Sequence, residues 1–523
     1  MSVEHVRANV RHIPYRRLGT IEVQLRYCED DPEIRQFLGS RPRNGADLLR
    51  RAPLNARRLV DRRDLSVSFT DYAERHGAPQ EVLDSARAVA SDDTFFVITG
   101  QQPGLFGGPL YSVHKAATAV RLARELSELP DAPRVVPVFW NHSDDHDLDE
   151  VNRAFLPNSS QEVQRVRLDL PAASGEPIRS IRVGRAMESA LAEVATLLPD
   201  SDFLESVMDV FRPRHADEHF GDAMARLLFS LFGEDGLLVI EPRDLPASAF
   251  EVLPRWCEMS DSIRDRIGGV TEHLTDIGLD VTMDPTATLM FEMAGDRRVP
   301  LAASEPFRRA QDLSPGVLLR PLWQDACLPT IGFVVGPGEL SYLAIAGPLY
   351  KTLGVPQPVF VPRASMTLVE PSIGRVLNRC GLDIPDLTRD PAEIAAELDD
   401  GSEGTVEEAL NSLGDQIDSE LKRIAALVAD SDPQLVAPAS RTQSKIAEEL
   451  TKLTKKLRKA REQRVGTGLL QVRKLVANLR PRGRLQERVL PILPFMVRHG
   501  TSISRSILDA ADPFCIDHGV VEL

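Results

Sequence analysis

Ionisable side chains are concentrated in the stretch WNHSDDHDLDE, residues 140–150. Two histidines and five carboxylates fall within these eleven positions. Imidazoles and carboxylates at this density could bind a divalent cation, or could hold a substrate ammonium group and accept a proton as a general base. The order of histidine and aspartate matches no standard metal signature, which weakens the metal interpretation. A solvated surface loop is the third alternative.

A glycine-rich stretch, VITGQQPGLFGGPLYSVHK, occupies residues 97–115. It is not a Walker A loop, because Pro109 follows Gly108 where a lysine is required, and it also lacks the G-x-G-x-x-G spacing. Its glycines would let backbone amides approach a ligand, and a helix beginning here would favour an anion. A tight structural turn explains the pattern equally well. The side-chain donors in this stretch are Thr99, Gln101, Gln102, Tyr111, His114 and Lys115.

Lysine placement singles out one of these donors. Lys115 is the only lysine in the first 350 residues, where arginine supplies every other cation. A chain that uses arginine by default and lysine here could require a compact ammonium group at this position, although chance gives the same pattern.

A third polar stretch, RPLWQDACLPTIGFVVGPGELSYLAIAGPLY, spans residues 320–350, where an apolar run leads through Gly336, Pro337 and Gly338 into a helical pattern. Glu339 falls in the first turn of the predicted helix, where the helix dipole favours a carboxylate. It could cap that helix or contact a ligand together with Gly338 and Tyr342.

The elements around these stretches predict an α/β fold with a parallel sheet. Buried apolar runs predict strands at residues 94–100, 134–140, 236–241, 330–335 and 358–362, and helical spacing predicts helices at 116–129, 339–353 and 365–380. The first strand, helix and second strand form a βαβ unit with a right-handed crossover. Ligands bind at the carboxyl ends of the strands in such sheets, so we expect the three polar stretches to line one cleft.

The last third of the chain has a different pattern. Long helices are predicted at residues 406–428 and 441–465, separated by a turn that contains Pro433 and Pro438. In the second helix, apolar residues alternate four and three apart as a heptad seam requires, at Ile446, Leu450, Leu453, Leu457 and Ala460. We interpret this as an antiparallel helical hairpin, and favour a dimerisation arm over a purely internal hairpin.

These patterns divide the chain into five segments. Residues 1–151 hold the N-terminal region and the first half of the core, and 152–231 form an inserted connective subdomain. The second half of the core, with a further insertion, spans 232–384. The antiparallel coiled coil follows at 385–480, and residues 481–523 return to the core.

Composition excludes several classes of protein. The apolar runs are too short to span a membrane, and the N-terminus lacks the apolar segment of a secretory signal, so we expect a cytoplasmic protein. Five scattered cysteines without a C-x-x-C pair argue against a disulfide framework or a zinc cluster. Residues 441–480 carry 12 lysines and arginines against three glutamates, but they lack interleaved aromatic residues and the remaining chain is acidic. We therefore expect no nucleic-acid partner.

Several long strings carry a resemblance to a known family. They are VITGQQPGLFGGPLYSVHK, PVFWNHSDDHDLDEVN, QDACLPTIGFVVGPGELSY and PVFVPRASMTLVE, followed by TKKLRKAREQR and GRLQERVLPIL. From about residue 90 to its end, the chain resembles the bacillithiol biosynthesis cysteine-adding enzymes, BshC.

The resemblance implies a Rossmann-like core with inserted connective subdomains and a coiled-coil arm through which two chains pair. It implies the last step of bacillithiol synthesis, in which the carboxyl group of L-cysteine is joined to the amine of glucosaminyl malate. The core is similar to that of class I aminoacyl-tRNA synthetases, whose HIGH-type nucleotide motif would correspond to residues 108–114. This sequence departs from that motif, since His114 is the only histidine there and no KMSKS-type lysine loop follows.

The leading hypothesis is adenylation of cysteine by ATP, followed by attack of the sugar amine. His114 and Lys115 would stabilise charge on the phosphate, and Asp145, His146 and Asp147 would orient the cysteine ammonium group or accept a proton. The residues expected to bind substrate are Thr99, Gln101, Gln102, Gly104, Gly108, Tyr111, Trp140, Asp144, Gln324, Asp325, Gly338, Glu339 and Tyr342. No metal is assigned. The alternatives are a metal-dependent hydrolase that uses residues 142–150 and a nucleic-acid-binding coiled coil.

Overall fold

The computed structural model describes residues 10–54, 58–158, 160, 162–171, 175–279, 287–302, 306–398, 405–431, 438, 441–442, 444–453, 455 and 467–523. The chain divides into two compact units, Met1–Pro371 with Arg484–Leu523, and Ser372–Gly483. The five segments expected from the sequence stay a prediction.

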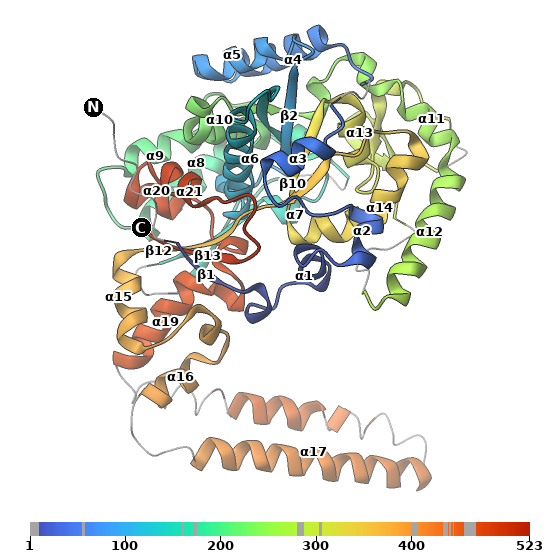
Figure 1. Cartoon of the computed structure of the whole chain (residues 1–523). Coiled ribbons are helices and arrows are strands. Elements are labelled where there is room, and N and C mark those ends of the chain that lie inside the picture. Colours follow the sequence, from blue (N-terminus) through green and yellow to red (C-terminus); the bar gives the residue numbers. More distant parts are fainter. Residues whose placement is uncertain are drawn as a thin grey trace. The chain divides into compact units, whose positions relative to one another are not determined.

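A five-stranded sheet forms the centre of the first unit (Figure 1). Every neighbouring pair is parallel, and the order across the sheet is β11-β10-β2-β3-β6. The strand order reverses between β2 and β10, which is the switch point where open α/β sheets bind ligands. The predicted α/β fold is confirmed, with strands β2 (Thr94–Gln101), β3 (Arg134–Asn141), β6 (Leu238–Ile240), β10 (Thr330–Val335) and β11 (Val359–Pro362) at the five expected positions.

Apolar residues on both faces of β2 account for its central place in the sheet. Phe96 and Ile98 belong to the larger hydrophobic core. Phe95 and Val97 point to the other face, in a smaller core that includes Leu122 of helix α6 (Tyr111–Ser127). A strand buried on both faces reads as a continuous apolar run, which is why it is recognisable in the sequence.

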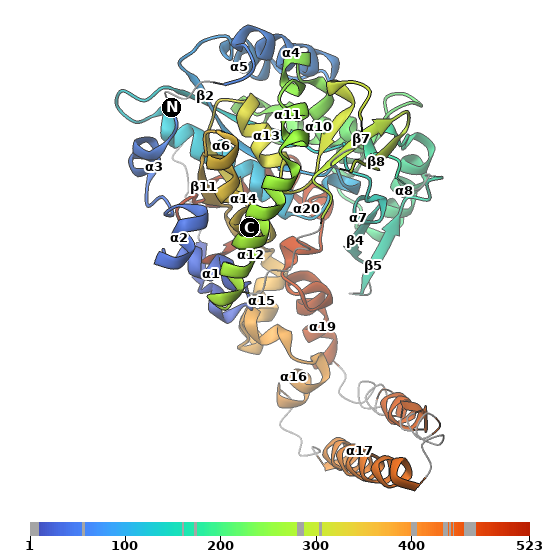
Figure 2. The ribbon, with the colours of Figure 1, turned by 90° about the vertical axis from the view of Figure 1, so that its right-hand side faces the viewer.

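The remaining elements of this unit surround the sheet (Figure 2). Small sheets are formed by β1 (Val10–Ile13), β13 (His518–Glu522) and β12 (Ser365–Val369), by β4 (Arg153–Pro157) and β5 (Val163–Arg167), and by β8 (Arg297–Pro300), β7 (Met290–Ala294) and β9 (Leu313–Pro315). The helices are α1 (Glu22–Cys28), α2 (Pro32–Leu38), α3 (Gly45–Arg51), α4 (Arg62–Arg75), α5 (Gln80–Ala88), α7 (Leu148–Val151), α8 (Gly184–Leu197), α9 (Leu204–Phe211), α10 (Phe220–Phe232), α11 (Leu253–Glu258), α12 (Ser260–Asp276), α13 (Arg320–Cys327), α14 (Pro337–Leu353), α20 (Leu493–His499) and α21 (Ile503–Ala510).

The predicted helix at residues 365–380 is wrong at its beginning. Residues Ser365–Val369 form strand β12, and helix α15 (Pro371–Cys380) begins only at the proline. Strand β12 pairs in parallel with β13 at the C-terminal end of the chain, and β13 pairs antiparallel with β1. Local periodicity cannot show a partner strand so distant in sequence, so tertiary pairing overrides the helical pattern.

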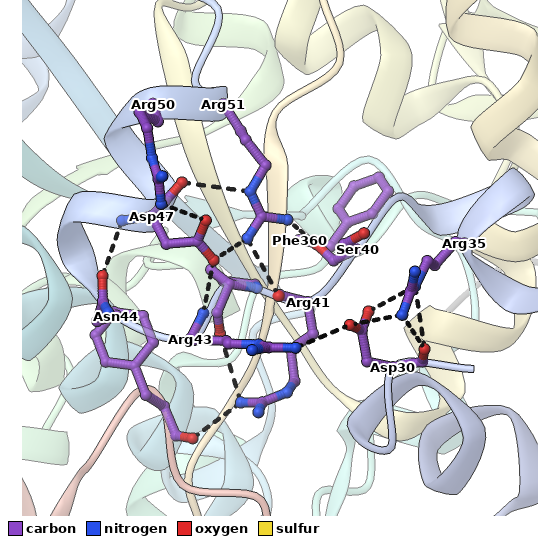
Figure 3. A network of polar contacts seen from close by, with 12 residues as sticks. Asp30, Arg35, Ser40, Arg41, Arg43, Asn44, Asp47, Arg50, Arg51 and Phe360 are labelled. Carbon is purple, nitrogen blue, oxygen red and sulfur yellow. Dashed lines mark hydrogen bonds and ion pairs between the residues drawn. The ribbon is translucent and has the colours of Figure 1, made fainter. Parts of the chain in front are cut away.

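The N-terminal helices fix the position of α14. A Cβ atom at Gly347 of α14 would lie 1.9 Å from the backbone oxygen of Phe37 in α2, so only glycine permits this approach. An arginine network holds the segment after α2 (Figure 3). In it, Arg51 donates to the backbone oxygens of Ser40 at 2.7 Å and Arg41 at 3.2 Å.

The second unit is helical. It contains α15, α16 (Pro391–Leu398), α17 (Thr405–Ser431) and α19 (Thr467–Leu479), and α16 packs on α19. Helix α17 confirms the first predicted long helix, and residues 441–442, 444–453 and 455 are helical as predicted. In the predicted seam, Ile446 and Leu450 are half-buried and Leu453 is 45% exposed, whereas Leu457 and Ala460 lie outside the described residues. In the part of the chain that the structure describes, no helix is long and apolar enough to cross a membrane.

Candidate active site

The three polar stretches meet around one cavity of about 430 Å³ at the carboxyl ends of β2 and β3. We call it the main cavity. The first turn of α14, which follows β10, forms another wall. The cavity is lined by Gly100, Gln101, Gln102, Trp140, His142, Asp145, His146, Glu150, Ala287, Thr288, Phe291, Arg298, Val317, Arg320, Pro321, Gln324, Phe333, Glu339 and Tyr342.

A second cavity of about 260 Å³ shares Gln101, Gln102 and Glu150 with the main cavity. Its remaining lining residues are Gly104, Gly108, Pro109, Tyr111, Val151, Arg153, Ala154, Phe155, Arg484, Arg488, Val489 and Pro491. The sequence-predicted site residues are therefore divided. Eight line the main cavity, Gly104, Gly108 and Tyr111 line only the second, and seven line neither.

Lys115 is committed to partners within the protein. Its Nζ lies 2.5 Å from Oε2 of Glu339 and donates to the backbone oxygen of Gly100 at 2.6 Å and to Oε1 of Gln101 at 3.1 Å. Burial lowers the pKa of Lys115, and the charge of Glu339 opposes that shift. The ammonium group ties α6 to α14 across the ends of β2 and β10, behind the cavity wall.

His114 lines neither cavity. It is fully buried, and its Nδ1 lies 3.0 Å from Oε2 of Glu487. Glu487 also forms a buried ion pair with Arg363 at 2.6 Å. Burial lowers the pKa of His114 despite the neighbouring carboxylate. Neither His114 nor Lys115 lines the main or the second cavity, and their predicted role at a phosphate stays a prediction.

The carboxylates of residues 140–150 point in different directions. Asp144 is buried in an ion pair with Arg243 at 2.6 Å, and Asp147 caps α7 by accepting a hydrogen bond from the backbone N–H of Glu150. Only Asp145 and Glu150 among the acidic residues of this stretch line the main cavity. Across the residues that the structure describes, no group of three or more histidine, cysteine, aspartate or glutamate side chains is arranged to hold a metal ion.

Asp145 is an ionised acid of the main cavity. Burial opposes its ionisation, but the charges of Arg298 and Arg320, with the hydrogen bond from the backbone N–H of His146, outweigh burial and hold the pKa of Asp145 far below its usual value. Its Oδ2 accepts a 2.6 Å hydrogen bond from Gln102, and its Oδ1 lies 3.6 Å from Nη1 of Arg298. The carboxylate is therefore available as an anion at neutral pH.

His142, which the sequence indicated only as a member of the cluster at residues 140–150, lies in the wall of the main cavity. It is 4% exposed, and among the described residues neither ring nitrogen has a hydrogen-bond partner. Burial, followed by the charge of Arg320, holds the pKa of His142 well below its ordinary value. The imidazole is therefore neutral at pH 7, and its Nε2 lies 3.9 Å from Oδ2 of Asp145. A neutral imidazole in a cavity wall is suited to accept a proton.

The basic side of the main cavity was also missed. Arg298 of β8 is buried over the ring of Phe291, 3.9 Å from its centroid, and Arg320 begins α13. Arg298 lies outside the three polar stretches, and Arg320 begins the third one but was assigned no role there. Among the other lining residues, the sequence predicted substrate binding for Trp140, Gln324, Glu339 and Tyr342.

Three predicted residues serve the surrounding structure. Thr99 donates to the backbone oxygen of Val334 at 3.0 Å, between β2 and β10. Asp325 accepts a 2.6 Å hydrogen bond from Tyr350, and burial raises its pKa to about 6. A Cβ atom at Gly338 would meet no other atom within 4 Å, and this glycine lines neither cavity.

Replacing Gly100 by alanine is expected to lower the free energy of unfolding by about 1–3 kcal/mol. A Cβ atom there would lie 2.6 Å from the backbone oxygen of Trp140, so β2 and β3 would have to separate at the cavity. Urea unfolding measures the loss. Gly338→Ala is the matched control, with no expected loss, and equal stability of the two variants would contradict the close contact.

Two family models match the chain. "Bacillithiol biosynthesis BshC, N-terminal Rossmann-like domain" matches residues 9–311 and 303–364. "Bacillithiol biosynthesis BshC, C-terminal coiled-coil domain" matches residues 366–523. Together they cover the parallel sheet with its cavities and the helical unit.

Proteins similar to this chain over most of its length carry the name "Putative cysteine ligase BshC". The protein of Salinibacter ruber is 30% identical over 95% of this chain and 95% of its own length. The protein of Symbiobacterium thermophilum is 30% identical over 86% of this chain and 87% of its own length. That of Chlorobaculum tepidum is 28% identical over 92% of each.

Proposed function

Because this chain belongs to the BshC family of bacillithiol biosynthesis, whose relatives are named as ligases, we propose that it joins the carboxyl group of L-cysteine to the amine of glucosaminyl malate. The observation that carries the proposal is the composition of the main cavity. An ionised Asp145, a neutral His142 and the guanidinium of Arg320 line the same space.

Each group matches one requirement of amide formation. The carboxylate of Asp145 would hold the cysteine ammonium group, and Arg320 with Arg298 would hold its carboxyl end. The acceptor amine must lose a proton as it attacks, and His142 would take that proton. The C–N bond forms from the nitrogen lone pair, while the activated carboxyl oxygen leaves with its bonding electrons.

ATP stays a prediction as the source of activation. A free carboxylate is a poor electrophile, which supports a need for activation of some kind. His114 and Lys115 are the two side chains that the sequence predicts to contact the phosphates of ATP, but both are buried and held by partners within the protein, which does not support that role. We therefore assign no step to ATP.

Incubation of the purified protein with L-cysteine and glucosaminyl malate, followed by mass spectrometry, tests the reaction. We expect the amide product with ATP present and none when ATP is omitted. The same amount of product without ATP would refute activation by the nucleotide, but it would not contradict the proposed ligase reaction. No product under any activating condition, with both substrates present, would refute the proposal itself.

A homodimer through the helical unit is the second part of the proposal. On α17, Leu413, Ile424 and Leu427 are 44%, 44% and 56% exposed, and Leu453 adds a further exposed apolar side chain. Apolar residues at this exposure on long helices favour coverage by a second copy. Light scattering should give the mass of two chains, and the mass of one chain would contradict it.

A further inference from the structure

Three arginines line the second cavity. Arg153 begins β4, and Arg484 and Arg488 lie in the segment that leads from the helical unit back to the sheet. All three are exposed. Among the described residues, none of their guanidinium groups forms an ion pair or a hydrogen bond, whereas other cavity-lining arginines such as Arg298 do. These three positive charges outnumber Glu150, the acidic residue that lines the same cavity, and so favour an anion.

Backbone forms another part of the lining of the second cavity. A Cβ atom at Gly104 would lie 2.8 Å from Cα of Gly108, and Gly108 has a φ of +67°. The two glycines therefore bring main chain, without side chains, to the cavity surface. Helix α6 begins in the same wall at Tyr111, and the amino end of a 17-residue helix carries partial positive charge.

The second cavity continues the main one. Gln101, Gln102 and Glu150 line both, so a single substrate molecule can occupy the two spaces. A substrate whose reacting amine lies beside His142 would then have its other end near Arg153, Arg484 and Arg488.

We propose that the second cavity binds the dicarboxylate end of the acceptor substrate through Arg153, Arg484 and Arg488. This rests on the proposed ligase function, in which the malate part of glucosaminyl malate carries two carboxylates. Guanidinium groups bind carboxylates through paired, charge-assisted hydrogen bonds. The phosphates of ATP are the other anionic groups that these arginines could bind, and the experiment below distinguishes ATP from the dicarboxylate.

The test compares the double variant Arg484→Gln, Arg488→Gln with wild type and with Arg264→Gln. Arg264 is an exposed arginine on α12 that lines neither cavity. We expect the KM for glucosaminyl malate to rise at least about tenfold in the double variant, since each bond to a charged group contributes appreciably. The KM values for cysteine and ATP should stay within about twofold, and Arg264→Gln should match wild type.

Calorimetric titration of wild type and the double variant with free malate gives a readout without turnover. Malate binding that is lost in the double variant supports the subsite, even if the wild type proves inactive as a ligase. In that case the proposed function fails and the anion site stands. An unchanged KM for glucosaminyl malate together with unchanged malate binding would overturn the subsite. A rise in the KM for ATP alone would overturn the assignment of the second cavity to the dicarboxylate.

Discussion

Replacing His142 by asparagine is expected to lower kcat for amide formation by about 10²–10⁴-fold, the usual contribution of a positioned acid–base group. His142 is buried in the wall of the main cavity, unpartnered and neutral. Asparagine keeps a polar side chain of smaller size but cannot take up the proton of the attacking amine. Steady-state rates measured by product mass spectrometry give the effect, with little change expected in KM.

The pH dependence provides a second readout of the same residue. A base acts only when unprotonated, and burial with the charge of Arg320 lowers the pKa of His142 below its ordinary value. The kcat of wild type should therefore stay level on going from pH 8 to about pH 6.5, the ordinary histidine pKa, and fall only at lower pH. That acid limb should be absent from His142→Asn. His273→Asn, an exposed histidine of α12, should behave as wild type.

Replacing Glu487 by glutamine is expected to lower the free energy of unfolding by about 3–5 kcal/mol, because it leaves Arg363 buried without its counter-charge. Glu487 accepts hydrogen bonds from Arg363 at 2.6 and 2.8 Å, from Ser365 at 2.8 Å and from the backbone N–H of Met366 at 2.9 Å. The network joins the C-terminal segment to α6 and β12. Urea unfolding at pH 7 measures the loss.

The control is Glu234→Gln, which removes an exposed partner of Arg505 and should cost at most about 1 kcal/mol. Burial opposes ionisation of Glu487, but Arg363 and His114 hold its pKa well below the ordinary value. The stability that this carboxylate contributes is therefore complete above the pKa of an unfolded glutamate, about 4.3, and is lost as pH falls toward the folded pKa. The difference between wild type and Glu487→Gln should shrink below about pH 4. A difference that grows in acid would contradict the assignment.

The positions of the sheet strands could be predicted from the sequence because each is a short, continuous apolar run. Strand β12 could not, since Ser365–Val369 becomes a strand only by pairing with β13 at the other end of the chain. The same difference between local and long-range information applies to the residues that line the main cavity. Motifs at strand ends located Gln102, Asp145 and Glu339, whereas Arg298 reaches the cavity from a segment without a motif and Arg320 was quoted in the third stretch without a role.

The density of ionisable residues at 140–150 was a correct indication of the cavity's position but a poor guide to individual roles. Sequence proximity does not show direction, and Asp144 and Asp147 turn away to pair with Arg243 and to cap α7. The unusual lysine was likewise a real signal. Lys115 supplies a compact ammonium group in a tight space, but its partners are Glu339 and Gly100 of the protein itself.

A crystal structure of the protein with L-cysteine and glucosaminyl malate bound tests the central claim most directly. The predicted result places the cysteine carboxyl group and the acceptor amine in the main cavity, with the amine within hydrogen-bonding distance of His142 and the cysteine ammonium group at Asp145. Both substrates bound away from the carboxyl ends of β2 and β3, with the main cavity empty, would contradict it.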